Sequence, residues 1–260
     1  MKEEEKVWHY QENQFDNSTK KNFKLMNIIN SDHFAKLQSQ SADPVILTLL
    51  NRTTPLHDAF ILKYSSWLSA KALYKGETER VQVMLTDLGN VKSKQWDIQI
   101  QIVYPKGSAD YIAILPNGRK PLYSGTIDSR ISYLQSFIQQ LTLYPSLSAT
   151  KASVQTFYTT LTTARDKQQQ KEGLADNASS LLEIARRDIA MMMYRNLGVL
   201  MDKYAVTPES ISAFWELALF RTHIKDDEQL ISGKVTQAET GIPLQGVTIT
   251  LLETTKTVQT

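Results

Sequence analysis

Apolar residues recur at alternating intervals of three and four along the chain from Val154 onward. The series comprises Val154, Phe157, Leu161, Ala164, Gln168, Lys171, Ala175, Ala178, Leu182, Ala185, Ile189, Met192, Asn196 and Val199. This spacing is typical of a helix that buries one side against a neighbour. No proline interrupts residues 146–205, and Thr207–Pro208 supplies a stop. We predict one very long helix over about 146–205, roughly 90 Å in length.

The polar run RDKQQQKEG, at 165–173, leaves two interpretations of this stretch. In the first, the helix continues with an exposed or polar-packed middle. In the second, the chain turns back near Gly173 and Asn177 and forms a helical hairpin. The first is favoured, because the apolar series keeps its phase across the run and one glycine costs an exposed helix only about 1 kcal/mol.

Shorter patterns before residue 146 predict the helices that pack against this long one. Asp43–Pro44 predicts a helix start, and Gly76 predicts its end. A second helix is expected over 77–88, where Gly89–Asn90 breaks it. An inward set is expected on the first helix, namely Phe60, Tyr64, Trp67, Leu68 and Leu73.

The segment 93–104 alternates with period two, which is typical of a strand. A strand without a local partner is unstable alone, so a helix is favoured there. Ser108 and Thr126 are expected N-caps of the next two helices. The short link at Tyr144–Pro145 predicts that the second of them runs antiparallel to the long helix.

The last thirty residues are rich in Val, Ile and Thr and alternate with period two. Their motif, from Gly233 through Thr240–Gly241 and Pro243 to Gly246–Val247 and Ile249, resembles the start of the carboxypeptidase regulatory-like domain. That resemblance implies a small transthyretin-like β-sandwich, used as a non-catalytic module in surface and secreted proteins of the Bacteroidota. About three strands are present where such a domain needs about seven, so completion by further residues or by another chain is implied.

The helical part resembles an uncharacterised group of Bacteroidota proteins over residues 44–222. The resemblance rests on a segment like Lys94–Gln–Trp96–Asp97–Ile98 followed by Val103–Tyr104–Pro105 and the run to Pro121. It implies a fold and no activity.

Composition narrows the class of protein. The 260 residues have a formal net charge of +2, which gives no strong field toward nucleic acid or membranes. No cysteine is present, which excludes disulfides and thiolate chemistry. The N-terminal segment has no apolar core typical of a signal peptide, whereas the C-terminal module suggests the cell surface or exterior. These two indications of the cellular compartment disagree, and the sequence does not decide between them.

Candidate chemistry is sparse. His9, His33, His57 and His223 have no metal-ligand spacing, and no phosphate loop or nucleophile motif is present. Glu183 and Asp188 are expected to form ordinary surface ion pairs with Arg186 and Arg187. We predict no catalytic, cofactor-binding or metal-binding residue, and no cofactor or small-molecule ligand.

The sequence therefore predicts a mainly α protein. The expected parts are an N-terminal arm (1–42), an elongated antiparallel helical bundle (43–224), a linker (225–229) and the first strands of a β-sandwich (230–260). The favoured function is a non-catalytic structural or interaction protein that forms a homo-oligomer or joins a larger assembly. A helical pore-forming toxin and an enzyme with a site between helices are the alternatives. Candidate interaction residues are Phe157, Leu161, Leu182, Ile189, Met192, Val199, Val247, Ile249 and Leu251.

Overall fold

The computed structural model describes residues 13–16, 23–216, 219, 248–250 and 257–259. The chain divides into two compact units, Met1–Leu219 and Phe220–Thr260, and each is described by itself.

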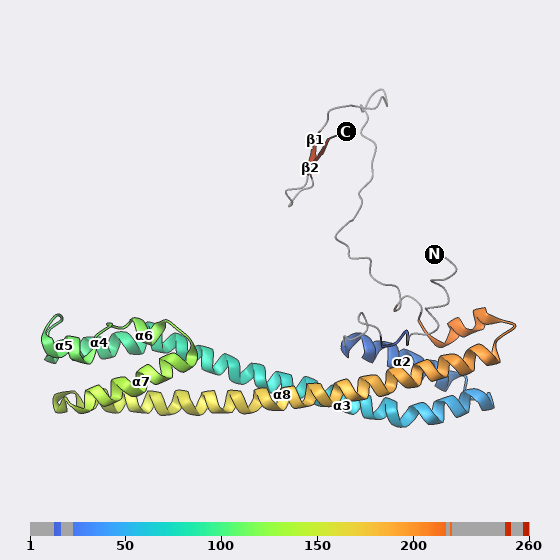
Figure 1. Cartoon of the computed structure of the whole chain (residues 1–260), viewed down its shortest axis with the longest axis horizontal. Coiled ribbons are helices and arrows are strands. Elements are labelled where there is room, and N and C mark those ends of the chain that lie inside the picture. Colours follow the sequence, from blue (N-terminus) through green and yellow to red (C-terminus); the bar gives the residue numbers. More distant parts are fainter. Residues whose placement is uncertain (1–12, 17–22, 217–218, 220–247, 251–256, 260) are drawn as a thin grey trace. The chain divides into compact units, whose positions relative to one another are not determined.

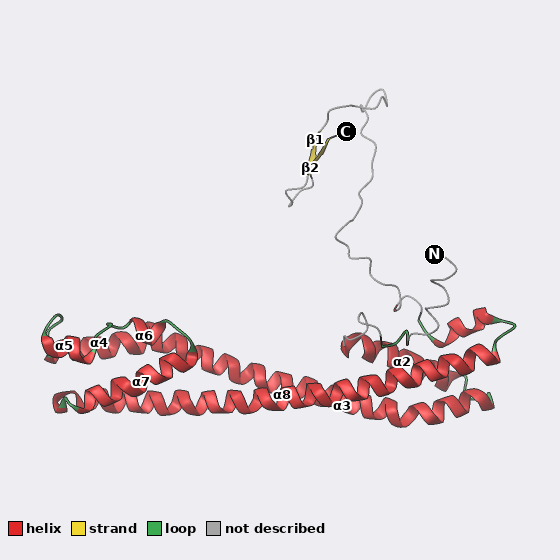
Figure 2. Cartoon of the chain, in the orientation of Figure 1, coloured by secondary structure: helices red, strands yellow, loops and turns green. Residues whose placement is uncertain are grey.

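The first unit is helical throughout its regular structure (Figures 1 and 2). Its elements are α2 (Phe23–Ser39), α3 (Pro44–Asp87), the π-turn η2 (Leu88–Lys92), α4 (Ser93–Val103), α5 (Ala109–Ile114), α6 (Lys120–Tyr123), α7 (Ile127–Thr142), the 3₁₀ turn η3 (Pro145–Leu147), α8 (Ser148–Lys203) and the 3₁₀ turn η4 (Pro208–Phe214). The mainly helical class is confirmed.

The long helix predicted over about 146–205 is α8, which runs unbroken from Ser148 to Lys203. The hairpin alternative is wrong, since residues 165–177 are all helical. Each predicted seam position of α8 is buried or half-buried. The seam keeps its phase because α3 packs antiparallel along it, as Figure 1 shows.

The predicted ends at Gly76 and at Gly89–Asn90 are wrong. From Pro44 to Val103 the chain is continuously helical, and it passes both glycines. At Gly76 the small cost of a glycine is outweighed by the packing that continues on either side. At Gly89 the helix takes a π-turn, which admits an extra residue. A Cβ at Gly89 would lie 3.0 Å from the Cβ of Tyr123 in α6, so the glycine allows this close approach.

Two separate cores form at the two ends of the long helices. At one end α4, α5, α6 and α7 cover the last part of α3 and the first part of α8, with Trp96, Leu134 and Leu161 at the centre. At the other end α2 contacts the first part of α3 and the last part of α8, and η4 contacts α2 and α8. Buried apolar residues of this second end include Met26, Ile29, Leu37, Ile46, Leu49, Phe60, Ile189, Met193, Leu200 and Phe214.

The helical prediction for 93–104 is confirmed by α4, which buries Trp96 and Ile100. The caps at Ser108 and Thr126 are also confirmed, since each side-chain oxygen accepts a hydrogen bond from a backbone N–H three residues on. The inward assignment of Leu68 and Leu73 is wrong, because both side chains are about half exposed. Neither belongs to the 3-4 series Phe60, Tyr64, Trp67 that faces α8.

In the second unit the structure describes β1 (Thr248–Thr250) and β2 (Thr257–Gln259), which pair antiparallel with Ile249 opposite Val258. This pair alone does not support a β-sandwich. The linker predicted at 225–229 and the predicted interaction residues Val247 and Leu251 lie outside the described residues.

Candidate interaction surface

Between the two cores α3 and α8 form a helix pair without fully buried side chains, which we call the bridge: residues 61–80 of α3 and 169–181 of α8. At the α2 end of the bridge, Trp67 packs edge-on against Phe23 of α2. No side chain of the bridge is buried, whereas Phe60 and Val81 flank the bridge on α3 and Gln168 and Leu182 flank it on α8, all four buried. The bridge of α3 is about 30 Å long. Over most of this length no third described helix lies against the pair (Figure 1).

Polar bonds between the two helices fix the register of the bridge. The Tyr74 hydroxyl donates to Glu172 Oε1 at 3.2 Å, and Gln168 Nε2 donates to Thr78 Oγ1 at 3.1 Å. The polar middle proposed for the RDKQQQKEG run is therefore observed, and it packs against tyrosine and threonine of α3.

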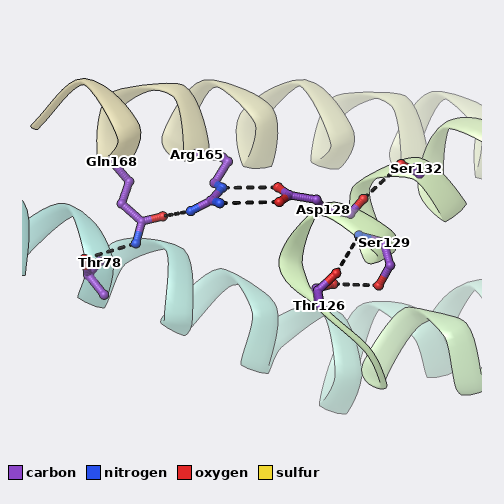
Figure 3. Close-up of polar contacts among 7 residues, drawn as sticks. All are labelled: Thr78, Thr126, Asp128, Ser129, Ser132, Arg165 and Gln168. Carbon is purple, nitrogen blue, oxygen red and sulfur yellow. Dashed lines mark hydrogen bonds and ion pairs between the residues drawn. The ribbon is translucent and has the colours of Figure 1, made fainter. Parts of the chain in front are cut away.

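A polar clamp closes the bridge where α7 begins, and Figure 3 shows its side chains pointing toward one another. Arg165 Nη1 donates to Gln168 Oε1 at 2.8 Å, while its Nε donates to Asp128 Oδ1 at 3.3 Å. Asp128 belongs to the first turn of α7, which Thr126 caps. The clamp consists of polar groups, and it joins α3, α7 and α8.

Each bridge helix carries a row of exposed apolar side chains that neither core uses. On α8 the row contains Leu174, Leu181, Ile184 and Met191, of which two pairs are seven residues apart. On α3 Leu62 and Leu73 are eleven residues, or about three turns, apart and share a face. The Tyr74–Glu172 bond puts Leu73 and Leu174 at the same level of the bridge. Exposed apolar side chains that gather on one part of a surface make that part a candidate for an interaction site.

The two helices of the bridge carry opposite charge. Residues 61–76 of α3 contain Lys63, Lys71 and Lys75 and no acid, and residues 172–183 of α8 contain three acids and no base. The acids are Glu172, Asp176 and Glu183. In the described part of the chain no salt bridge joins any of these lysines to a carboxylate. Glu183 forms ion pairs with Arg186 and Arg187.

The core that contains α2 holds a closed network of buried polar groups. Asn196 of α8 donates from Nδ2 to Thr53 Oγ1 at 2.9 Å, and its Oδ1 accepts from Arg52 Nε and Nη2 at 3.0 and 2.8 Å. His33 Nδ1 lies 3.0 Å from the Phe214 carbonyl oxygen, and its Nε2 lies 2.9 Å from Asn196 Nδ2. The network joins α2, α3, α8 and η4.

The hydrogen-bond partners of His33 determine which of its ring nitrogens carries a hydrogen. A carbonyl oxygen can only accept, so Nδ1 carries the hydrogen. Since the cationic Arg52 fixes the Asn196 oxygen, the Asn196 amide nitrogen donates to Nε2. The ring is therefore neutral, and burial lowers the pKa of His33 from 6.5 to about 4. Its ring stacks on Trp215 with centroids 4.4 Å apart.

Arg186 of α8 is only 1% exposed, so its assignment to a surface ion pair is wrong. Its Nε donates to Glu183 Oε2 at 2.7 Å, and its Nη2 donates to Asp16 Oδ1 at 2.6 Å. These bonds to Arg186 hold the pKa of Glu183 below its usual range. Burial is possible because two carboxylates compensate the cation, and Asp16 is 170 residues distant in sequence.

A shallow open groove lies beside this pair, between Phe23 at the start of α2 and the adjacent turns of α8. Asp176, Glu183, Ile184 and Arg187 are among its lining residues. Among the described residues no group of three or more His, Cys, Asp or Glu is placed to hold a metal ion. No described helix is long and apolar enough to cross a membrane.

The predicted interaction residues of α8 lie within the helical unit. Leu161, Leu182 and Ile189 are fully buried there. Phe157, Met192 and Val199 are half-buried, and Phe157 packs edge-on against Trp96. Ile249 lies in β1, and Val247 and Leu251 lie outside the described residues.

The exposed row of α8 was missed by the sequence reasoning, although a signal for it exists. Leu174 to Leu181 and Ile184 to Met191 each span one heptad. The polar positions Asn177 and Asp188 interrupt the row, so the more continuous seam on the other face dominated the pattern. No family model matches the chain, and neither the curated proteins nor the solved structures contain a significant match to it.

Proposed function

We propose that this chain is a non-catalytic structural protein that acts as a spacer and scaffold subunit within a larger assembly. The bridge supports this proposal most directly. It separates two packed ends by a helix pair that buries no side chain of its own yet is held in register by specific polar bonds. The exposed apolar rows on the same helices provide surface for partners.

Other features support the same function. Three deeply buried polar residues, His33, Asn196 and Arg186, bond to groups of the same unit, and so they serve its packing. The resemblance of the C-terminal residues to a carboxypeptidase regulatory-like module favours a place at the cell surface or exterior.

The spacing is testable because the chain contains no cysteine. Gln155→Cys and Arg195→Cys place dyes at two exposed positions of α8 on either side of the bridge. Forty residues of helix separate them by about 60 Å. Single-molecule energy transfer in dilute solution should give one narrow distance distribution near that value.

Gly173→Pro supplies the matched control, since proline breaks a helix interior. It should broaden the distribution. A broad or short distribution in the unmodified background would mean that the bridge bends freely, and the spacer function would be rejected.

A further inference from the structure

We propose that residues Asn13–Asp16 form a detachable strap, which holds η4 and the residues that follow it against α2. Release of the strap would free the part of the chain that leads to the second unit, which begins at Phe220. Such a device is independent of the spacer function, because it concerns how one end of the helical unit opens and not the distance between its ends.

Two side chains of the strap contact residues that are far away in the sequence. Phe15 is only 3% exposed, and the centroid of its ring lies 5.6 Å from that of Trp215. Asp16 Oδ1 accepts the hydrogen bond from Arg186 Nη2 described above. Within the strap, Asn13 Oδ1 accepts from the Phe15 N–H at 3.0 Å, and the Asn13 carbonyl accepts from the Asp16 N–H at 2.9 Å. The strap is thus a single turn that presents an aromatic ring and a carboxylate to the helical unit.

The residues that the strap holds depend on contacts with other elements. η4 is a 3₁₀ turn without a side-chain cap, and 3₁₀ segments have poorer hydrogen-bond geometry than an α-helix. Directly after it, Trp215 stacks on His33 of α2, and the Glu216 N–H donates to Asp32 Oδ2 at 2.7 Å. Trp215 therefore connects the strap to α2, because its ring contacts both Phe15 and His33.

Three features of this cluster favour opening. Arg186 Nη1 and Trp215 Nε1 are buried, and neither atom has a hydrogen-bond partner among the described residues. A buried donor without a partner is costly, because it has lost its bonds to water. The Asp16 side chain is 37% exposed, so solvent already weakens its ion pair with Arg186. Opening would return both donors to water, and this gain offsets part of the contacts that are lost.

Opening of the strap would couple the two ends of the chain. The strap precedes α2 in the sequence, and the residues that it holds precede the second unit. A partner that binds the strap in its released form therefore shifts the chain toward the open form. By linkage, a partner that holds the open form of the C-terminal residues makes the strap available in the same proportion.

Amide hydrogen exchange of the full chain, followed by mass spectrometry, tests the strap. Phe15→Ala and Asp16→Ala should each raise the exchange rate of peptides covering 208–216 at least about tenfold, because each removes one of the two side chains that fix the strap. Peptides from the core around Trp96 should keep their rates in both variants.

The matched controls remove the same groups from the other core. Phe157→Ala deletes a ring that packs against Trp96, and Asp128→Ala deletes the carboxylate that accepts from Arg165. Both should leave the exchange of 208–216 unchanged. Circular dichroism of each variant verifies that the long helices remain intact.

Two results would overturn the inference. Unchanged exchange over 208–216 in either strap variant would mean that η4 is held without the strap. Faster exchange by the same factor throughout the helical unit would mean that Phe15 and Asp16 serve only its overall stability. The dye distance measured along α8 involves neither residue, so the spacer function is judged separately.

Discussion

Acidification should destabilise the α2 end of the molecule through His33. The folded chain keeps this ring neutral until the pH approaches its pKa of about 4, whereas the unfolded chain takes up a proton near 6.5. Between these values the unfolded state binds more protons, so the free energy of unfolding falls as the pH falls. Above pH 6.5 His33 is neutral in both the folded and the unfolded chain, so the free energy of unfolding carries no penalty from this residue.

The size of the effect follows from the shift in pKa. A difference of about 2.5 units corresponds to about 3 kcal/mol, at about 1.4 kcal/mol per unit. Protonation at Nε2 would place a hydrogen against the amide nitrogen of Asn196, which is itself a donor. Turning the amide would not help, because its nitrogen would then face Arg52. The network therefore has no arrangement that accepts the added proton.

The assay is urea unfolding followed by far-UV circular dichroism at a series of pH values from 7 to 4. His33→Gln retains one donor and one acceptor but cannot titrate in this range. The loss of stability from pH 7 to pH 4 should be about 3 kcal/mol smaller in this variant. His57→Gln is the comparison: burial also lowers the pKa of His57, but this half-buried ring contacts Asn30 outside the Asn196 network. Parallel losses in the unmodified chain and His33→Gln would refute the reasoning.

Further substitutions test the remaining packing by chemical denaturation. Asn196→Leu should lower the free energy of unfolding by about 3 kcal/mol, since several buried polar groups lose their partner; a neutral result would contradict the network. Arg186→Met should cost about 1–2 kcal/mol, less than a fully buried pair, because its carboxylates are partly solvated; a stabilised variant would show that the charges are dispensable. Gly76→Ala and Gly173→Ala should each raise stability by about 0.5–1 kcal/mol, because nothing lies within 4 Å of the added Cβ. Gly125→Ala should lose at least about 1 kcal/mol, since φ is +103° and the Cβ would lie 2.6 Å from Ser129 Oγ; equal stability would contradict that geometry.

Periodicity predicted the helices well where each buries a continuous stripe. The series from Val154 to Val199 predicted the phase of α8, even across its polar run, and the proline-free stretch before Thr207–Pro208 predicted its length. Gly76 was misjudged because local end signals were given more weight than the 3-4 series that continues from Tyr74 through Thr78 to Val81.

The buried polar network was beyond such reasoning. His33 and Asn196 are 163 residues apart, and the pattern of apolar residues in either helix does not indicate that the two side chains meet. In the series from Val154 to Val199, Asn196 is one of the few polar residues, and the series gives it no role. Its role emerges when Thr53 and Arg52 of α3 are placed against it, which requires the register between two long helices rather than the periodicity of one.

The absence of buried side chains along the bridge also affects how the molecule unfolds. Cooperativity between the two cores must pass through helical backbone, a few polar bonds and half-buried apolar side chains such as Tyr64 and Trp67, because no side chain of the bridge is fully buried. Each end is therefore expected to open with its own free energy, as separate foldons do. Amide hydrogen exchange should show two levels of protection joined by a weakly protected segment, and a single melting temperature would not describe the chain.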